Sequence, residues 1–493
     1  MPKDAILAID QGTSSTKCLV IGRHGDVLAR VAVPLAESCP EPGWVEQDGE
    51  QIWASVRSAV SQAMDQVGDA RIAAIGLSTQ RESLMLWDRK SGAPISPLLS
   101  WQDQRTAPRA RSMASGGPPQ KIRALSGLPL DPMFSALKAE WLLDRFDRDR
   151  SRARAGDLAL GTVDSWLLAK LGGEHTIEIG NASRTQLLDT RRGVWSDELC
   201  QIFNVPQQAL PAVTPSTGPF PGTRALSPLP DGTPVAAVLG DSHAALFGHG
   251  LHRPGAVKAT YGTGSSVMGL VGDRAVGEES GACLTIAWQI GGDKPAHAVE
   301  GNIRSAGSTL KWLGEVFGVS LDELVGEAVA AQSAGVHLVP AFNGLGAPYW
   351  DDDAVALLSG FKLGTGRSAL FRAGFESIPH QVADVVEAVE RSTGLTIDEL
   401  HADGGPSAND ALMQLQADLA GKPVHRVATS ELSALGAAHL AGLSIGFWSE
   451  SELAALPRRH DSFWPRMAEA ERGRQRANWR AAVRCARGTV SGG

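Results

Sequence analysis

Residues 5–20, AILAIDQGTSSTKCLV, place an acidic residue and a glycine between two short apolar runs. The run AILAI is too short for a helix and predicts a buried strand that ends at Asp10, after which Gly12 permits a tight reversal. The second run, CLVI, then completes a hairpin. The turn carries hydroxyl groups beside a cation: Thr13, Ser14, Ser15, Thr16 and Lys17. Such hydroxyls, together with backbone N–H groups, form a nest that binds anions such as phosphate.

This turn differs from a Walker-type phosphate loop. That loop requires a glycine directly before the lysine and a helix after it, and GTSSTK has neither. Because Gly-Thr-Ser turns also occur in ordinary hairpins, the turn alone leaves a purely structural role open. Asp10 favours the phosphate interpretation, since a carboxylate beside a polyphosphate is repulsive unless a divalent cation lies between them. Asp10 therefore predicts bound Mg²⁺.

Length and composition limit the classes of protein to consider. The 493 residues are 43% hydrophobic, enough for two or more domains with large cores. A formal charge of −8 without a long basic stripe argues against nucleic acid or an anionic membrane as the partner. The five cysteines contain no CxxC pair, and no apolar stretch approaches the length of a bilayer span. We therefore expect a soluble, cytoplasmic protein.

Strand-like and helical segments alternate along the chain, which predicts an α/β fold. Runs such as IAAIGLS and PVAAVLG indicate strands, and EQIWASVRSAVSQAMDQV indicates an amphipathic helix. After residue 250, GAVKATYGTGSSVMGLV repeats the strand, turn and strand of the opening segment. Two such hairpins predict two like domains, which together would hold a nucleoside triphosphate in a shared cleft that closes on the ligand.

A third loop, HADGGPSAND at 401–410, precedes the helical segment ALMQLQADLAG. Its paired glycines allow a ligand ring to approach the backbone, and Asn409 is placed to bind a base or ribose. The alternative is a simple capped turn, in which Asn409 caps the following helix.

The two hairpins, the DGG turn and their order resemble the actin, hexokinase and sugar-kinase ATPase superfamily, and within it the FGGY carbohydrate kinases. The likeness is greatest to the glycerol kinases of that family, through AIDQGTSST, AAIGLSTQRES, GDSHAALFG, TYGTGSS and ALGAAHLAGL among other segments. The resemblance implies two ribonuclease H-like domains flanking a nucleotide cleft. It implies an N-terminal domain at 1–247, a C-terminal domain at 248–455 and a helical tail packed on the body at 456–493.

The resemblance also implies transfer of the γ-phosphoryl group of ATP to a terminal hydroxyl of a small polyol, glycerol or a close relative. Asp241 then takes the role of catalytic base, and Asp10 binds Mg²⁺ through water. Asp241 has an alternative role as a helix cap. The implied nucleotide-binding residues are Thr13, Ser14, Ser15, Lys17, Thr263, Gly307, Lys311, Gly405 and Asn409. Lys311 stands where glycerol kinases usually carry glutamine.

The implied acceptor pocket agrees less well with the glycerol kinase pattern. Its residues are Arg81, Glu82, Trp101, Met133, Asp241, Ser242 and Ser266. Arg81 and Glu82 supply a charged donor and acceptor that suit vicinal hydroxyls, although adjacent charges are often a solvated surface pair. Met133 replaces an expected tyrosine, Ser242 a glutamine and Ser266 an aromatic residue. These changes remove polar contacts and add volume, so a four- or five-carbon polyol or a ketose, of the erythritol or xylulose type, is the alternative acceptor.

Other possibilities carry less support from the sequence. His243, His249 and His252 do not have the spacing of a zinc motif and suit packing or surface positions. A non-catalytic ATPase module is the alternative: a chaperone would need a separate peptide-binding module, and an actin-like filament protein would lack the QRES and WQDQR segments. The C-terminal segment suits a helix docked on the body. A homodimer and a homotetramer both stay open.

Overall fold

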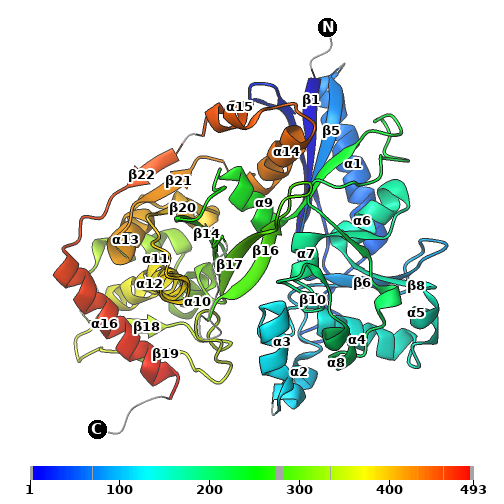
Figure 1. Ribbon diagram of the computed structural model, residues 1–493. Helices are drawn as coiled ribbons and strands as arrows, with labels where there is room; N and C mark the ends of the chain where they lie inside the picture. Colours follow the sequence, from blue (N-terminus) through cyan, green and yellow to red (C-terminus); the bar gives the residue numbers. More distant parts are fainter. Residues whose placement is uncertain are drawn as a thin grey trace. The chain divides into compact units, whose positions relative to one another are not determined.

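The computed structural model describes residues 4–68, 70–114, 116–272, 281–332, 335–429, 431–458 and 460–488 (Figure 1). The chain forms two compact units. Unit 1 comprises Met1–Gly250, Leu284–His297 and Glu431–Pro457, and unit 2 comprises Leu251–Cys283, Ala298–Ser430 and Arg458–Gly493. The units therefore do not follow chain order, because 284–297 and 431–455 belong to unit 1 although they fall within the predicted C-terminal domain at 248–455.

The main sheet of unit 1 has the strand order β13-β5-β1-β2-β3. Its strands are β1 (Asp4–Gln11), β2 (Ser15–Gly22), β3 (Val27–Pro34), β5 (Arg71–Thr79) and β13 (Val235–Gly240). The predicted hairpin at 5–20 is confirmed, because β1 pairs antiparallel with β2 and places Asp10 opposite Lys17. On its other side β1 pairs parallel with β5, which in turn pairs parallel with β13.

Helix α1 (Gly49–Val67) covers one face of this sheet. Its carboxylate cap, Asp48, accepts hydrogen bonds from the backbone N–H groups of Glu50 and Gln51. Apolar residues of α1 share a buried cluster with alternate residues of β1, including Leu7 and Ile9. Alternation places these β1 side chains on one face of the sheet, so burial against α1 fixes which face they occupy. Helix α14 (Leu432–Ser444) also packs on this sheet, against β1, β5 and β13.

The rest of unit 1 surrounds a smaller sheet with the order β4-β7-β6-β8. The strands are β4 (Glu46–Gln47), β6 (Leu84–Asp88), β7 (Leu98–Leu99) and β8 (Leu158–Thr162). A second apolar cluster joins this sheet to nearby helices. The helices that contribute to this cluster are α2 (Ala107–Ala114), α3 (Pro118–Ser126), α4 (Ser135–Phe146), α5 (Ser151–Ala155) and α8 (Asp197–Ile202). Further helices of unit 1 are α6 (Val163–Gly172), α7 (Ile179–Ser183), α9 (Asp241–Gly248) and α15 (Glu450–Ala455). Short strands of the unit are β9 (Thr176–Glu178), β10 (Leu188–Asp189), β11 (Val194–Trp195) and β12 (Ala212–Thr214). Strand β16 (Cys283–Trp288) is the first strand of a seven-stranded sheet with the order β16-β17-β15-β14-β20-β21-β22.

The sheet of unit 2 repeats the plan of unit 1. Successive neighbours are β17 (Ala296–Ile303), β15 (Ser265–Leu270), β14 (Ala256–Tyr261), β20 (Glu399–Asp403), β21 (Val424–Val427) and β22 (His460–Phe463). Strand β14 pairs antiparallel with β15 and parallel with β20, as β1 does with β2 and β5. Strand β21 extends the sheet in parallel beyond β20, as β13 does beyond β5. The sequence echo after residue 250 therefore reflects two like sheets, as predicted.

The helices of unit 2 are α10 (Gly307–Phe317), α11 (Leu321–Ala330), α12 (Arg367–Thr393), α13 (Asp410–Ala420) and α16 (Glu469–Ala486). A short ladder, β18 (His337–Val339) with β19 (Leu357–Ser359), lies against α16 (Figure 1). The helix expected in the C-terminal segment is α16, which packs on α12 through the buried Arg476 and Trp479. None of the helices in the described ranges is long and apolar enough to span a bilayer.

Candidate active site

The carboxyl ends of three parallel strands meet at one edge of the unit 1 sheet. Asp10 of β1 lies beside Ser78 of β5, and Gly240 of β13 lies beside Thr79. Asp241 follows β13 directly and begins α9. Ligands of open α/β sheets bind at such edges, because loops and helix starts converge there. The sheet thus brings Asp10 and Asp241, which are far apart in sequence, to the same edge.

The carboxylate of Asp10 is buried and accepts a hydrogen bond from a neighbouring strand. The hydroxyl of Ser78 donates to Oδ1 of Asp10 at 2.8 Å. Burial raises the pKa of Asp10 to about 6, and the hydrogen bond from Ser78 and the charge of Lys17 oppose this rise. The carboxylates of Asp241 and Glu431 raise the pKa further. The edge of the sheet is therefore locally rich in negative charge, a setting that a cation would stabilise.

Two donors fix the carboxylate of Asp241. Nε of Arg81 donates to its Oδ1 at 3.0 Å, and the backbone N–H of Ser242 donates to the same oxygen at 2.6 Å. Gly240 is needed for this arrangement, because a Cβ there would lie 2.6 Å from Cδ of Arg81. Asp241 is the first helical residue and Gly240 is the N-cap, so the alternative of Asp241 as the capping residue is wrong.

Arg81 and Glu82 form a tight turn after β5. The N–H of Ser83 donates to the carbonyl of Arg81 at 2.7 Å, and Glu82 has a positive φ of 61°. In a non-glycine residue this conformation causes backbone strain, which surrounding contacts must offset. The side chains of Arg81 and Glu82 are buried, with 8% and 5% exposure. The interpretation as a solvated surface pair is therefore wrong.

Glu82 is held by an arginine that the sequence reasoning did not select. Nε of Arg184 donates to Oε1 of Glu82 at 2.6 Å, and both side chains are buried. The guanidinium of Arg184 lies over the ring of Phe134, 5.1 Å from its centroid. The hydroxyl of Ser135 donates to the backbone carbonyl of Glu82 at 2.9 Å. The carboxylate and the backbone of Glu82 are thus both positioned by neighbouring elements.

The phosphate-type turn of unit 1 is tied to the acceptor segment through Thr13. Nε1 of Trp101 donates to the hydroxyl of Thr13 at 3.0 Å, and Trp101 is 37% exposed. Nε2 of Gln47 donates to the carbonyl of Thr13 at 2.7 Å, and Gln80 donates to Gln47 at 2.9 Å. Ser14 is exposed, while the side chains of Ser15 and Lys17 are half-buried. A displacement of the turn would therefore disturb both Trp101 and the segment after β5.

Met133 lies half-buried in the loop before α4. The buried Lys138 donates to the carbonyls of Pro132 at 2.8 Å and Met133 at 2.5 Å. Burial lowers the pKa of Lys138 to about 8, although the nearby carboxylates of Glu82 and Asp103 oppose this. Lys138 therefore fixes the backbone of the loop that presents the Met133 side chain.

The second phosphate-type turn belongs to unit 2. The exposed Thr263 accepts, at its carbonyl, hydrogen bonds from the N–H groups of Ala306 and Ser308. Gly307 begins α10, and its N–H donates to the carbonyl of Gly262 at 3.0 Å. The turn and the start of α10 are thus one hydrogen-bonded assembly.

Two other predicted residues of this unit have side-chain partners in the protein. Lys311 is exposed on α10 and lies 3.9 Å from Glu315. The hydroxyl of Ser266 donates to the buried Glu300 at 3.0 Å. Neither contact excludes a ligand, because exposed pairs contribute little and a serine hydroxyl also accepts.

The two glycines of the DGG turn have different roles. Gly404 has a φ of 90°, and a Cβ there would lie 2.0 Å from the carbonyl oxygen of Tyr261. A Cβ at Gly405 would meet no atom of the described residues within 4 Å, so the space beside it is open to a ligand. Asn409 caps α13 by accepting from the N–H of Leu412 at 3.0 Å. The capping role of Asn409 is confirmed, and its contact with a nucleotide stays a prediction.

Each unit gathers part of the predicted site. Unit 1 joins Asp10, Thr13, Arg81, Glu82, Trp101 and Asp241 through the contacts above, and unit 2 carries Thr263, Ser266, Gly307, Lys311, Gly405 and Asn409. Sequence reasoning missed the buried partners: Gln47, Ser78, Gln80, Lys138 and Arg184. Ser78 could have been found from strand register and Arg184 from the motif NASRT, whereas nothing local marked Gln47 or Lys138. His243 and His249 are buried, as a packing role predicts.

Family models match nearly the whole chain. The model of the N-terminal domain of the FGGY family of carbohydrate kinases matches residues 5–248, and the model of the C-terminal domain matches residues 257–445. The chain belongs to the FGGY family of carbohydrate kinases. A glycerol kinase of Alkalilimnicola ehrlichii is 42% identical over 98% of both chains. A glycerol kinase of a Geobacter species is 40% identical over 98% of this chain and 99% of the relative.

Solved structures of carbohydrate kinases share the fold of this chain. The crystal structure of Plasmodium falciparum glycerol kinase with ADP has a TM-score of 0.93 at 28% identity, covering 98% of both chains. A ligand-bound xylulose kinase from Lactobacillus acidophilus has a TM-score of 0.87 at 19% identity, covering 98% of this chain and 97% of that one. The latter likeness concerns the fold alone. This FGGY kinase therefore has the two-domain α/β architecture of the actin and hexokinase ATPase class, as predicted.

Proposed function

We propose that this FGGY kinase transfers the γ-phosphoryl group of ATP to a terminal hydroxyl of glycerol, in the cytoplasm. The observation that carries the proposal is the Asp241 carboxylate, held by Arg81 and the Ser242 N–H beside Asp10 at the sheet edge. Relatives at 40–42% identity over nearly the full chain are glycerol kinases, which supports the choice of acceptor. The expected absence of nucleic-acid and membrane partners, and the choice between dimer and tetramer, stay predictions.

Asp241 serves in this proposal as the base for the acceptor hydroxyl. Oδ1 of Asp241 accepts from Arg81 and from the Ser242 N–H, and its side chain is 40% exposed, so the carboxylate is accessible to an acceptor hydroxyl. An alcohol and an aspartate differ in pKa by roughly ten units, so removing the proton before reaction would cost more than ~10 kcal/mol. The proton must therefore move late, as the hydroxyl oxygen bonds to the transferring phosphorus. Arg81 orients the carboxylate until that moment.

Asp10 is the residue that we propose holds Mg²⁺, directly or through water. Mg²⁺ usually takes one or two carboxylates and keeps several waters, so a single carboxylate at a polyphosphate site suffices. The raised pKa of Asp10 fits this role, because a cation would stabilise the ionised form that burial disfavours. When bound, the ion neutralises charge on the transferring phosphoryl group. Ser78 orients the carboxylate by its hydrogen bond to Oδ1.

The remaining predicted residues are assigned to nucleotide and acceptor. Thr13, Ser14, Ser15 and Lys17 would bind phosphate in unit 1. In unit 2, Thr263, Gly307, Lys311, Gly405 and Asn409 would contact the nucleotide. Glu82, oriented by Arg184, would accept from an acceptor hydroxyl, and Trp101 would pack on its carbon chain.

A four- or five-carbon polyol or a ketose is a second candidate acceptor. The positions of Met133, Ser242 and Ser266 carry smaller or less polar side chains than the glycerol kinase pattern leads us to expect. One additional buried CH₂ contributes about 0.8 kcal/mol and a satisfied hydrogen bond about 1 kcal/mol. Together these two contributions favour the longer acceptor by about tenfold in kcat/KM, provided that no other side chain fills the added space.

A coupled assay of ADP release over three- to six-carbon polyols and ketoses tests the proposal. Asp241→Asn should lower kcat by at least ~100-fold through loss of the proton acceptor, with nucleotide affinity retained. The matched control is Asp65→Asn, which makes the same substitution at an exposed position of α1. Turnover of Asp241→Asn equal to that of the control would remove Asp241 from the mechanism.

A further inference from the structure

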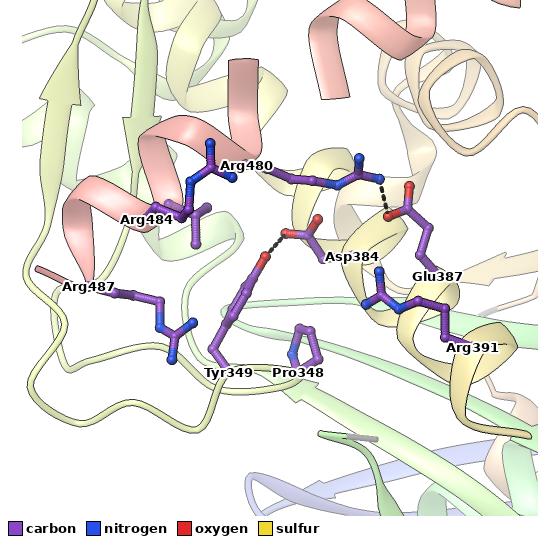
Figure 2. A pocket seen from close by; sticks show the side chains of 9 residues that line it. Pro348, Tyr349, Asp384, Glu387, Arg391, Arg480, Arg484 and Arg487 are labelled. Carbon is purple, nitrogen blue, oxygen red and sulfur yellow. Dashed lines mark hydrogen bonds and ion pairs between the residues drawn. The ribbon is translucent and has the colours of Figure 1, made fainter. Parts of the chain in front are cut away.

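Unit 2 contains a pocket with four arginines in its lining, on the side of α12 where α16 packs. It holds about 190 Å³ and is bordered by Arg391 of α12, by Arg480 and Arg484 of α16, and by Arg487 just beyond α16. Figure 2 shows Arg391 reaching toward the pocket from α12, Arg480 and Arg484 coming from α16, and Arg487 from the residue after it. Positions 480, 484 and 487 lie on one helix face, because their spacings are four and three residues. None of these residues belongs to the site described above.

The two carboxylates that line the pocket already have protein partners. Glu387 accepts from Nε of Arg476 at 3.1 Å and from Nη2 of Arg480 at 2.6 Å. Asp384 accepts from Arg476 at 2.5 Å, from Nε1 of Trp479 at 2.7 Å and from the hydroxyl of Tyr349 at 2.9 Å. The contacts of Arg476, Trp479 and Arg480 attach α16 to α12, and Figure 2 shows the one between Arg480 and Glu387. The carboxylates are therefore structural, and the lining holds more guanidinium groups than carboxylates, although Arg480 is paired with Glu387.

Helix ends explain only part of this arrangement. Arg391 and Arg484 lie in the last turns of α12 and α16, where a cation interacts favourably with the helix dipole. That effect accounts for each arginine separately and does not require them to meet at one pocket. Arg487 is fixed in the wall, because it pairs with Asp351 at 2.8 Å and lies over the ring of Tyr349. Arg391 is exposed and, within the described part of the chain, makes no hydrogen bond or ion pair, so its donors are accessible to a ligand from solvent.

The charge and size of the pocket define the ligand class. Guanidinium groups match the oxygens of phosphate bidentately, and an excess of them repels cations. Pockets for drug-sized ligands measure roughly 300–1,000 Å³, so this pocket suits a much smaller molecule. We propose that it binds a small phosphate dianion, either inorganic phosphate or the monoester of a short polyol, between α12 and α16. The inference does not depend on which acceptor the kinase phosphorylates.

Calorimetric titration of the full chain with inorganic phosphate and, separately, with glycerol 3-phosphate tests the site. Arg391→Gln should weaken the binding of the true ligand by about tenfold or more, because one charge-assisted contact is lost. Arg391→Lys should give an intermediate affinity, since it keeps the charge and loses the planar fork. Arg253→Gln is the control, an exposed arginine of unit 2 outside the pocket lining.

The readout is the binding step that Arg391→Gln weakens, because glycerol 3-phosphate also has access to the reaction site. Weakening of that step for inorganic phosphate alone, or for both probes, assigns the pocket to the phosphate group itself. Weakening for glycerol 3-phosphate alone assigns it to a phosphomonoester. Equal affinities of Arg391→Gln and Arg253→Gln for both probes, with both variants folded, would overturn the proposal. Failure of glycerol as the acceptor would leave the phosphate titration unchanged, so the two proposals fail separately.

Discussion

Replacement of Arg184 by methionine tests whether a buried ion pair holds the acceptor side of the site. Met approximates the length of the arginine side chain without its charge or donors. The substitution leaves the Glu82 carboxylate, which is 5% exposed, without the donor at 2.6 Å. Breaking a buried pair by removing one partner costs about 3–5 kcal/mol, chiefly because the remaining charge is desolvated and uncompensated.

The cost should appear as a lower melting temperature. A loss of 3–5 kcal/mol in the free energy of unfolding lowers the melting temperature by roughly 5–15 °C for a folded unit of this size. The control is Arg152→Met, which breaks an exposed pair with Asp88 at 3.1 Å in the same unit. An exposed pair contributes about 0–1 kcal/mol, so this control should lose only a few degrees.

A double variant separates the charge effect from lost packing. Glu82→Gln with Arg184→Met removes both charges, so it should recover much of the stability that Arg184→Met loses. Differential scanning calorimetry gives the melting temperatures, and polyol saturation kinetics should show a KM raised by about tenfold in Arg184→Met if Glu82 binds the acceptor. Equal melting temperatures for Arg184→Met and Arg152→Met would refute the reasoning. So would a double variant no more stable than Arg184→Met.

Three further predictions concern Asp10, the acceptor pocket and Trp101. Because burial raises the pKa of Asp10 from 3.8 to about 6, the folded chain binds an extra proton between these pH values and loses stability as pH rises through them. At pH 8, Asp10→Asn should therefore stabilise the fold by on the order of 3 kcal/mol and raise the melting temperature. At pH 4 it should change the melting temperature little, so equal increases at pH 8 and pH 4 would contradict this prediction. Met133→Tyr with Ser266→Phe should move the ratio of kcat/KM toward glycerol over longer polyols, and an unchanged ratio would remove both positions from acceptor choice. Trp101→Phe keeps the ring and loses the hydrogen bond to Thr13, so KM for ATP should rise by about tenfold, whereas a KM equal to that of the unmodified enzyme would contradict the coupling.

Local pattern was sufficient for the elements that carry the site. The hairpin at 5–20, the second hairpin after residue 250 and the helix after HADGGPSAND are all present where the apolar runs and turn residues predict them. Each depends on contacts between neighbours in sequence, or on a period that matches a strand or helix. The repeat of GTSS and GTGSS also predicted two like sheets, because similar hairpins require similar strand partners.

The tertiary structure decided what lies beside these elements. Residues 431–457 pack with unit 1 and not with the chain segments that precede them, because the surface that α14 buries is formed by β1, β5 and β13. Ser78 reaches Asp10, and Arg184 reaches Glu82, across sequence separations of 68 and 102 residues. No local pattern encodes such a contact, since it depends on strand register and on the packing of separate elements.

The sequence by itself thus determined the family, the strand and helix order and the residue types available for phosphoryl transfer. Only the folded chain decided that Arg81 and Glu82 are buried, that Asp241 begins α9 with Oδ1 fixed by Arg81, and that Asp10 has a pKa near 6. The physical reason is that burial, hydrogen-bond geometry and electrostatic environment arise from contacts that are made only when distant segments pack together.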